Sequence, residues 1–162
     1  MKKYKIYFVL FIWIIAMSCE KEDNDITNVD TNIDIAFIDS EGLDLLDPSN
    51  PNAYDKDQIK IYQLKDSKKE LFFEGNLDYP NGYFIFKEGD MEFYNIRILA
   101  TGVLEDSIAT IYLELDPNNT DTINSYIEKG NNSYICKKVL YNGLLVWKYE
   151  NSNPRQFVIE KE

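Results

Sequence analysis

Residues 133–149, Ser-Tyr-Ile-Cys-Lys-Lys-Val-Leu-Tyr-Asn-Gly-Leu-Leu-Val-Trp-Lys-Tyr, place an Asn-Gly pair between two apolar runs. Asn-Gly strongly favours a two-residue hairpin turn, because both positions accept the positive φ angles that this turn requires. The pattern predicts a strand over residues 133–141, a turn at Asn142 and Gly143, and a second strand over residues 144–149.

The rest of the chain repeats this pattern of short strands and turns. Apolar side chains follow a period of two over residues 32–39 and 107–115, and Pro80-Asn81-Gly82 is a turn signal between further apolar runs. No window has the apolar stripe of an amphipathic helix. The sequence therefore predicts one all-β domain over residues 32–162, an antiparallel β-sandwich of about eight to nine strands joined mainly by hairpins.

The first 18 residues have the pattern of an export signal. Three lysines give a positive start, and residues 6–17 form an apolar run of 12 residues. This run is too short for a stable transmembrane helix, which takes about 20 residues. Ala16-Met17-Ser18-Cys19 follows and resembles the lipobox of bacterial lipoproteins. The resemblance implies cleavage before Cys19 and acylation of its sulfur and of the new amino terminus.

Other interpretations of this segment stay open. A secretory peptide that is cleaved without lipidation, or an uncleaved anchor helix, fits the same apolar run. Cys19 and Cys136 are the two cysteines of the chain, and a disulfide between them would exclude the lipid. If Cys19 is acylated, we expect Cys136 to be a lone thiol buried among apolar side chains.

Charged residues follow Cys19 directly. Glu20, Lys21, Glu22 and Asp23 resemble the signal that exports lipoproteins of Bacteroidetes to the cell surface, although a solvated acidic linker would have the same composition. We expect residues 19–31 to be a lipidated, disordered tether. The whole chain resembles the small surface lipoproteins of Bacteroidetes, and its body resembles immunoglobulin-like or transthyretin-like exported domains in architecture.

The composition excludes several functions. The chain has 17 basic and 28 acidic residues, and removal of the three lysines in residues 1–18 leaves 14 against 28, a net charge of −14. This charge opposes binding to phosphate backbones, so we expect no nucleic-acid partner. Histidine is absent, which excludes the common zinc sites and Ser-His or Cys-His catalysis. We therefore expect that the protein is not an enzyme.

A long acidic loop near residues 42–57 suggests a calcium site, the one cofactor that we consider. Its carboxylates, with loop carbonyls, could supply the hard oxygen ligands that Ca²⁺ prefers. Their spacing fits no EF-hand, and acidic loops are often only solvated. The candidate ligands are Asp39, Asp44, Asp47, Asp55 and Asp57.

Trp147 and Tyr149 are candidate ligand-binding residues. They lie two positions apart in a predicted strand, so their side chains share one face. Aromatic rings on one face can stack against a sugar ring. The same rings could instead pack in the core, with the tyrosine reaching from core to rim.

Two short segments suggest a modification. Ser107, between Asp106 and Ile108, and Thr122, between Asp121 and Ile123, match an acidic-hydroxyl-apolar pattern. The pattern resembles the O-glycosylation sites of exported Bacteroidetes proteins.

Together these features favour a surface-exposed lipoprotein of the outer membrane. We expect it to be attached to the membrane through its lipid and to bind a glycan or a protein partner without catalysis. An accessory subunit of an envelope complex is an alternative. A glycoside hydrolase that uses a pair of carboxylates is a further one.

Overall fold

The computed structural model describes residues 28–99, 104–150 and 154–161. None of these residues is helical, and the described chain consists of strands, turns and loops. The all-β prediction is therefore confirmed. The predicted signal peptide over residues 1–18, the lipidated Cys19 and the export residues 20–23 lie outside the described residues.

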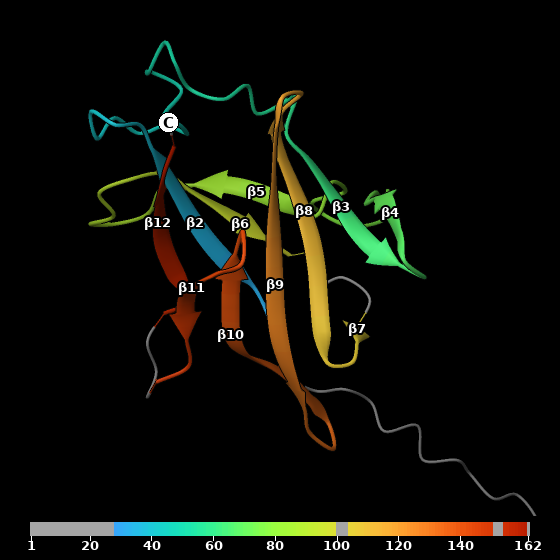
Figure 1. Cartoon of the computed structure of the whole chain (residues 1–162). Helices are drawn as coiled ribbons and strands as arrows, with labels where there is room; N and C mark the ends of the chain where they lie inside the picture. The colour runs from blue at the N-terminus through green and yellow to red at the C-terminus, as the bar shows by residue number, and fades with distance from the viewer. Residues whose placement is uncertain (1–27, 100–103, 151–153, 162) are drawn as a thin grey trace, which may run out of the picture.

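The larger sheet has eight strands, with the main order β1-β10-β9-β8-β3-β4 (Figure 1). Strand β11 pairs with β10, and β7 pairs with β8. The strands are β1 (Asn28–Asp30), β3 (Lys60–Lys65), β4 (Lys68–Leu71), β7 (Leu104–Glu105), β8 (Ile108–Asp116), β9 (Asn119–Lys129), β10 (Ser133–Tyr141) and β11 (Leu144–Lys148).

The smaller sheet has four strands in the order β12-β2-β6-β5. It lies behind the larger sheet in the view of Figure 1. Its strands are β2 (Ile33–Ile38), β5 (Tyr83–Phe86), β6 (Asn95–Ile98) and β12 (Gln156–Glu160).

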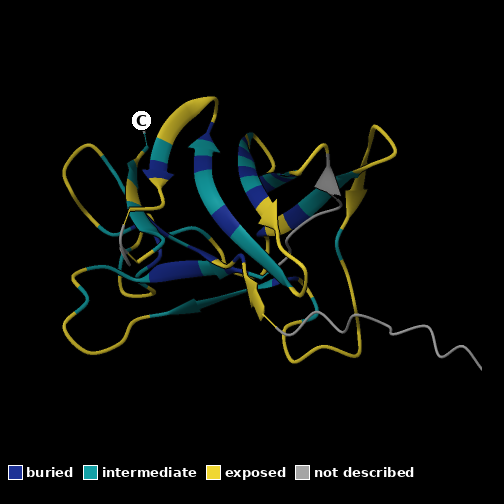
Figure 2. Ribbon diagram, turned by 90° about the horizontal axis from the view of Figure 1, so that it is seen from below, coloured by how far each residue is buried: buried dark blue, intermediate teal, exposed yellow. Residues whose placement is uncertain are grey.

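The hydrophobic core lies between the two sheets, which Figure 2 shows as two layers. Along β8, burial alternates from residue to residue, and Ile111 and Leu113 point inward. From the other layer, Ile35 and Phe37 of β2 join the same buried cluster. The period of two in the sequence thus places one side of each sheet in the core.

The Asn-Gly hairpin has the predicted geometry. Asn142 has a φ angle of 49° and Gly143 one of 81°, and β10 and β11 pair antiparallel on either side. The positive angles are those of a type I′ turn, which suits the twist of the two strands. Strand β10 covers the predicted residues 133–141.

Two pairings depart from the predicted antiparallel arrangement. Strand β12 pairs parallel with β2, and β1 pairs parallel with β10. The predicted number of strands is also too low, because β1 and β7 have only three and two residues and so carry no period-two signal. Hairpins still join most neighbouring strands of the larger sheet.

The predicted disordered tether over residues 19–31 is wrong for its last residues. Asn28, Val29 and Asp30 form β1 by pairing with Ser133–Ile135. Thr31 is only 5% exposed. The side chains of β1 are exposed, and it is backbone pairing that orders the segment. A search for apolar periodicity does not detect such a strand.

The part of the chain that the structure describes contains no helix able to span a bilayer.

Candidate functional site

The candidate site is a cavity at one end of the two sheets, which we call the Trp147 cavity. Its volume is about 480 Å³, and its lining includes Asp30, Asp34, Arg97, Trp147, Tyr149 and Arg155. These residues come from β1, β2, β6 and β11, from the position after β11, and from the position before β12. The two aromatic residues singled out from the sequence therefore line one cavity together with two arginines.

The two aromatic side chains differ in accessibility. Trp147 is 8% exposed, and its Nε1 donates a hydrogen bond to the carbonyl of Pro154 at 3.0 Å. Tyr149 is 46% exposed, and its ring lies edge-on to Trp147 with centroids 6.3 Å apart. Trp147 thus packs in the core, while Tyr149 lies at the rim of the cavity. Ligand binding by the two residues stays a prediction.

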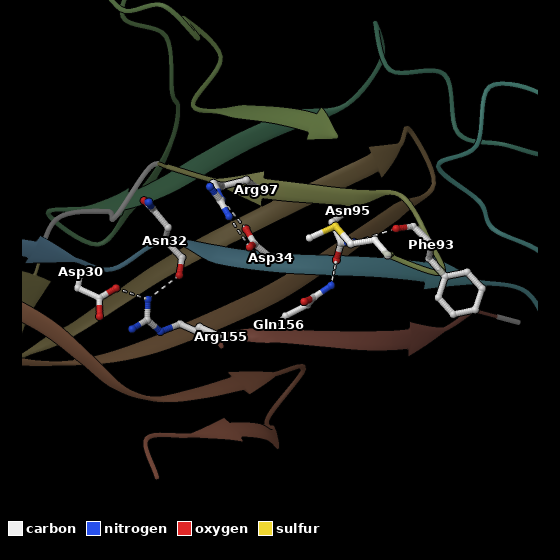
Figure 3. Close-up of polar contacts among 9 residues, drawn as sticks. Asp30, Asn32, Asp34, Phe93, Asn95, Arg97, Arg155 and Gln156 are labelled. Carbon is white, nitrogen blue, oxygen red and sulfur yellow. Dashed lines mark hydrogen bonds and ion pairs between the residues drawn. The ribbon is translucent and has the colours of Figure 1, made fainter. Parts of the chain in front are cut away.

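Arg155 is a buried cation beside Trp147. Its side chain is 7% exposed, and its guanidinium carbon lies 4.8 Å from the Trp147 ring centroid. Its Nη1 donates to Asp30 at 3.1 Å and to the carbonyl of Asn32 at 2.6 Å. Figure 3 shows these contacts on one side of β2. The Trp147 ring, the Asp30 carboxylate and the Asn32 carbonyl stabilise this guanidinium, which has little contact with water.

Arg97 forms the second charged pair of the cavity. Its Nε and Nη2 each donate to a different oxygen of Asp34, both at 2.7 Å (Figure 3). Hydrogen bonding to Asp34 raises the pKa of Arg97. The β2–β6 register places the two residues directly opposite each other, so the bidentate contact follows from the pairing.

A polar pair continues this row toward β12. Gln156 Nε2 donates to Oδ1 of Asn95 at 3.1 Å, and Asn95 Nδ2 donates to the carbonyl of Phe93 at 3.0 Å (Figure 3). Asn95 is only 1% exposed. Both the oxygen and the nitrogen of its side-chain amide have a hydrogen-bond partner, as buried polar groups usually do.

The carboxylates of the cavity are already engaged by arginines. A glycosidase needs one carboxylic acid that donates a proton and a second carboxylate that acts as base or nucleophile. Asp34 accepts two hydrogen bonds from Arg97, and Asp30 accepts one from Arg155. This arrangement suits the binding of polar groups better than proton transfer.

The five aspartates of the predicted calcium site serve mainly as turn acceptors. Each has at least one carboxylate oxygen in a hydrogen bond to a nearby group, mostly a backbone N–H within a few residues. Asp44 also accepts from the backbone N–H of Tyr94 at 2.7 Å. Among the described residues, no three acidic, cysteine or histidine side chains come together as a metal site. The calcium site stays a prediction.

The acidic loop does not border the Trp147 cavity. Asp44 and Asp47 line a separate hollow of about 260 Å³, and Asp57 lines another of about 290 Å³ beside Tyr79 and Tyr83. The sequence left open whether the loop and Trp147 border one concave surface or two. They border two.

A second buried polar cluster ties the carboxyl-terminal segment to the larger sheet. Lys161 Nζ lies 2.5 Å from Asp121 and 3.1 Å from Oδ1 of Asn119. Asn142 Nδ2 donates to the other oxygen of Asp121 at 2.8 Å. The side chains of Lys161 and Asp121 are 12% and 5% exposed. This cluster joins the two layers.

The remaining candidates lie apart from the cavity. Ser107 is exposed in the turn between β7 and β8, and Thr122 is half-buried within β9. Cys136 is a free, buried thiol, and burial raises its pKa. O-glycosylation of Ser107 and Thr122 stays a prediction.

The charged residues of the cavity, Asp30, Asp34, Arg97 and Arg155, were not predicted from the sequence. Arg97 alternates with Ile96 and Ile98 in the sequence, which is a visible but weak signal. Arg155 follows Pro154 in a loop, where nothing local marks it. The chain matches no protein-family model, no curated protein and no solved structure.

Proposed function

We propose that the protein is a lipid-anchored surface protein of the outer membrane whose β-domain binds a ligand without converting it. The lipobox and the charged export segment support the location. The observation that carries the binding proposal is the Trp147 cavity, where an exposed tyrosine ring stands beside two arginine-carboxylate pairs. The immunoglobulin-like or transthyretin-like architecture belongs to the same proposal.

The proposed ligand is a glycan. A sugar offers an apolar ring face and a rim of hydroxyl groups, and the cavity offers matching groups. The ring of Tyr149 is accessible to a sugar face, although Lys137 Nζ lies 4.4 Å from its centroid. The groups of Arg97 and Asp34 that are not used in their mutual contact can accept or donate hydrogen bonds to hydroxyls.

A glycan array with the native lipoprotein in detergent tests the proposal. We expect binding to a defined set of glycans, and at least about fivefold weaker binding for Tyr149→Ala, taking the stacking of a sugar on the ring as comparable to the roughly 1–3 kcal/mol of a base on an aromatic side chain. Tyr79→Ala is the matched control: Tyr79 is 43% exposed and borders a different hollow. Folded protein that binds no glycan above background would contradict the proposal.

An accessory subunit of an envelope complex is the second candidate. The hairpin after Gly143 carries Leu144 and Leu145, which are 73% and 59% exposed. Adjacent exposed leucines of this kind often mark a protein contact. This candidate requires a constant stoichiometric companion after crosslinking of intact membranes, and a ligand-binding module does not. A glycoside hydrolase, the third candidate, would release product from the glycans that it binds.

A further inference from the structure

The outer side of the larger sheet carries a row of tyrosines with lysines above them, which we call the tyrosine face. Along β8, Ala109, Ile111 and Leu113 are at most 1% exposed and point into the core. Side chains alternate along a strand, so Thr110 and Tyr112 point the other way. In Figure 1, β8 and β9 lie in front of the smaller sheet, and this outer side faces the viewer.

The strand register brings polar and aromatic groups together on this face. Tyr62 of β3 lies opposite Tyr112 of β8, and Thr110 lies opposite Asn124 of β9. Asn124 Nδ2 donates to the Thr110 hydroxyl at 3.0 Å. All four side chains are half-buried. They form a flat surface of rings, hydroxyl and amide groups.

Tyr126 extends the face along the strands. It lies opposite Ile108, which is four positions before Tyr112 on β8. Four residues of a strand span about 14 Å. The tyrosines at the two ends of the face are therefore separated by a distance that several linked sugar units would cover.

Two lysines place positive charge over these rings. Lys69 Nζ lies 4.2 Å from the centroid of Tyr62 and 5.2 Å from that of Tyr112. Lys138 Nζ lies 3.6 Å from the centroid of Tyr126. Within the described chain, neither lysine forms an ion pair with a carboxylate, whereas Lys60 on the same side is paired with Glu114. Cation–π contacts hold both ammonium groups over the rings.

Lys69 and Lys138 put positive charge on one face of an acidic chain. The chain has a net charge of −11, yet the tyrosine face presents two lysines that form no ion pair with a described carboxylate. An occupant that meets the lysines with negative groups and the tyrosines with ring faces would complement it. The acidic chain repels every polyanion, so single-stranded DNA is compared with an acidic polysaccharide in the test.

We infer that the tyrosine face binds a linear acidic polysaccharide, whose carboxylate or sulfate groups meet Lys69 and Lys138 while its sugar rings lie on Tyr62, Tyr112 and Tyr126. This surface is separate from the Trp147 cavity and goes beyond the function proposed for it. The Thr110 and Asn124 side chains lie between the two charged ends, where sugar hydroxyls would pass.

Electrophoresis of the native protein through gels that contain polygalacturonate tests this inference. We expect retardation by polygalacturonate but not by uncharged dextran, and weaker retardation at higher salt because exposed charges are screened. The double variant Lys69→Gln with Lys138→Gln should bind at least about threefold more weakly.

Two control variants test whether the retardation depends on the tyrosine face itself. Lys87→Gln removes an ammonium that lies 5.3 Å from the Tyr94 ring, away from the face, and should bind like the wild type. Tyr79→Ala removes a ring that is 43% exposed beside a different hollow, and this variant should also bind like the wild type. The inference is overturned if polygalacturonate causes no retardation, if the double variant behaves like the wild type, or if single-stranded DNA retards the protein equally.

Discussion

At the scale of single residues, the buried pair of Lys161 and Asp121 joins the carboxyl-terminal segment to the larger sheet. Its two side chains are 12% and 5% exposed, and Lys161 is the last described residue of the chain. A buried ion pair is costly to assemble, but removal of one partner leaves a charge that the interior cannot solvate.

We expect Lys161→Ala to lower the free energy of unfolding by about 3–5 kcal/mol, since it leaves the Asp121 carboxylate buried without its cation. Urea unfolding followed by circular dichroism measures the change. The matched control is Lys56→Ala, which breaks the fully exposed pair with Asp57 and should leave the urea midpoint unchanged. Equal midpoints for the two variants would show that the buried pair contributes nothing.

Tyr141 gives this cluster a pH dependence. Burial, and then the negative charge of Asp121, raise the pKa of the Tyr141 phenol above its usual value. The folded protein therefore keeps the phenol neutral at a pH where the unfolded chain ionises it. The phenol's contribution to the free energy of unfolding is fully present below its pKa in the unfolded chain, about 10. This contribution is lost as the pH rises above that value.

Tyr141→Phe should reduce the loss of stability between about pH 10 and pH 11, because phenylalanine has no proton to lose. Unfolding midpoints in urea at several alkaline pH values test this expectation. Tyr54 and Tyr83, whose pKa values burial also raises, should maintain part of the pH dependence. The same slope for variant and wild type would contradict the assignment to Tyr141.

Residue patterns predicted the aromatic part of the Trp147 cavity but not its charged part. Trp147 and Tyr149 share a face because they are two positions apart in one strand, which is local information. Arg97 and Arg155 reach the cavity only through the pairing of β6 and β12 with β2. Such contacts join residues far apart in the chain, and one sequence does not reveal them.

At the scale of elements, the Asn-Gly turn is the feature that links sequence to fold most directly. Gly143 has a φ angle of 81°, and a Cβ atom placed there would meet nothing within 4 Å. Any cost of a larger residue must therefore come from backbone strain and not from a clash.

Gly143→Ala should destabilise the protein by about 1–2 kcal/mol, the cost of a left-handed backbone for a residue with a Cβ atom. The unfolding midpoint measures this. Gly75→Ala is the loop control, since its Cβ atom would lie at an ordinary 3.5 Å from the Phe73 ring. An effect at Gly143 no larger than that at Gly75 would mean that the turn tolerates another geometry.

Strands with a clear period of two or a strong turn were predicted with nearly correct bounds. β10 matches the predicted residues 133–141, and the bounds of β2, β8 and β11 lie within one residue of the predicted 32–39, 107–115 and 144–149. The segment before β6 has aromatic residues that favour a strand, but its backbone makes turns and bonds to Asp44 instead. The parallel pairing of β12 with β2 joins the two ends of the domain and leaves no local signal.

At the scale of the whole molecule, the two-layer domain and the proposed lipid anchor have separate roles. The cavity and the tyrosine face belong to the described domain, whereas membrane attachment is assigned to Cys19 alone. We expect Cys19→Ser to move the protein from the detergent phase to the aqueous phase in a detergent-partition experiment, because acyl chains contribute roughly 0.8 kcal/mol per buried methylene. A variant that stays in the detergent phase would show that another segment attaches the protein to the membrane.

The most direct test of the binding proposal is the indole signal of Trp147 in an amide nitrogen–proton NMR spectrum. The other tryptophan, Trp13, lies within the predicted signal peptide, so the processed protein should give a single indole peak. On titration with the best glycan from the array, we predict that this peak and the Arg155 Nε peak shift together. Saturable binding that leaves both peaks unchanged, with shifts elsewhere, would contradict the assignment of the Trp147 cavity as the ligand site.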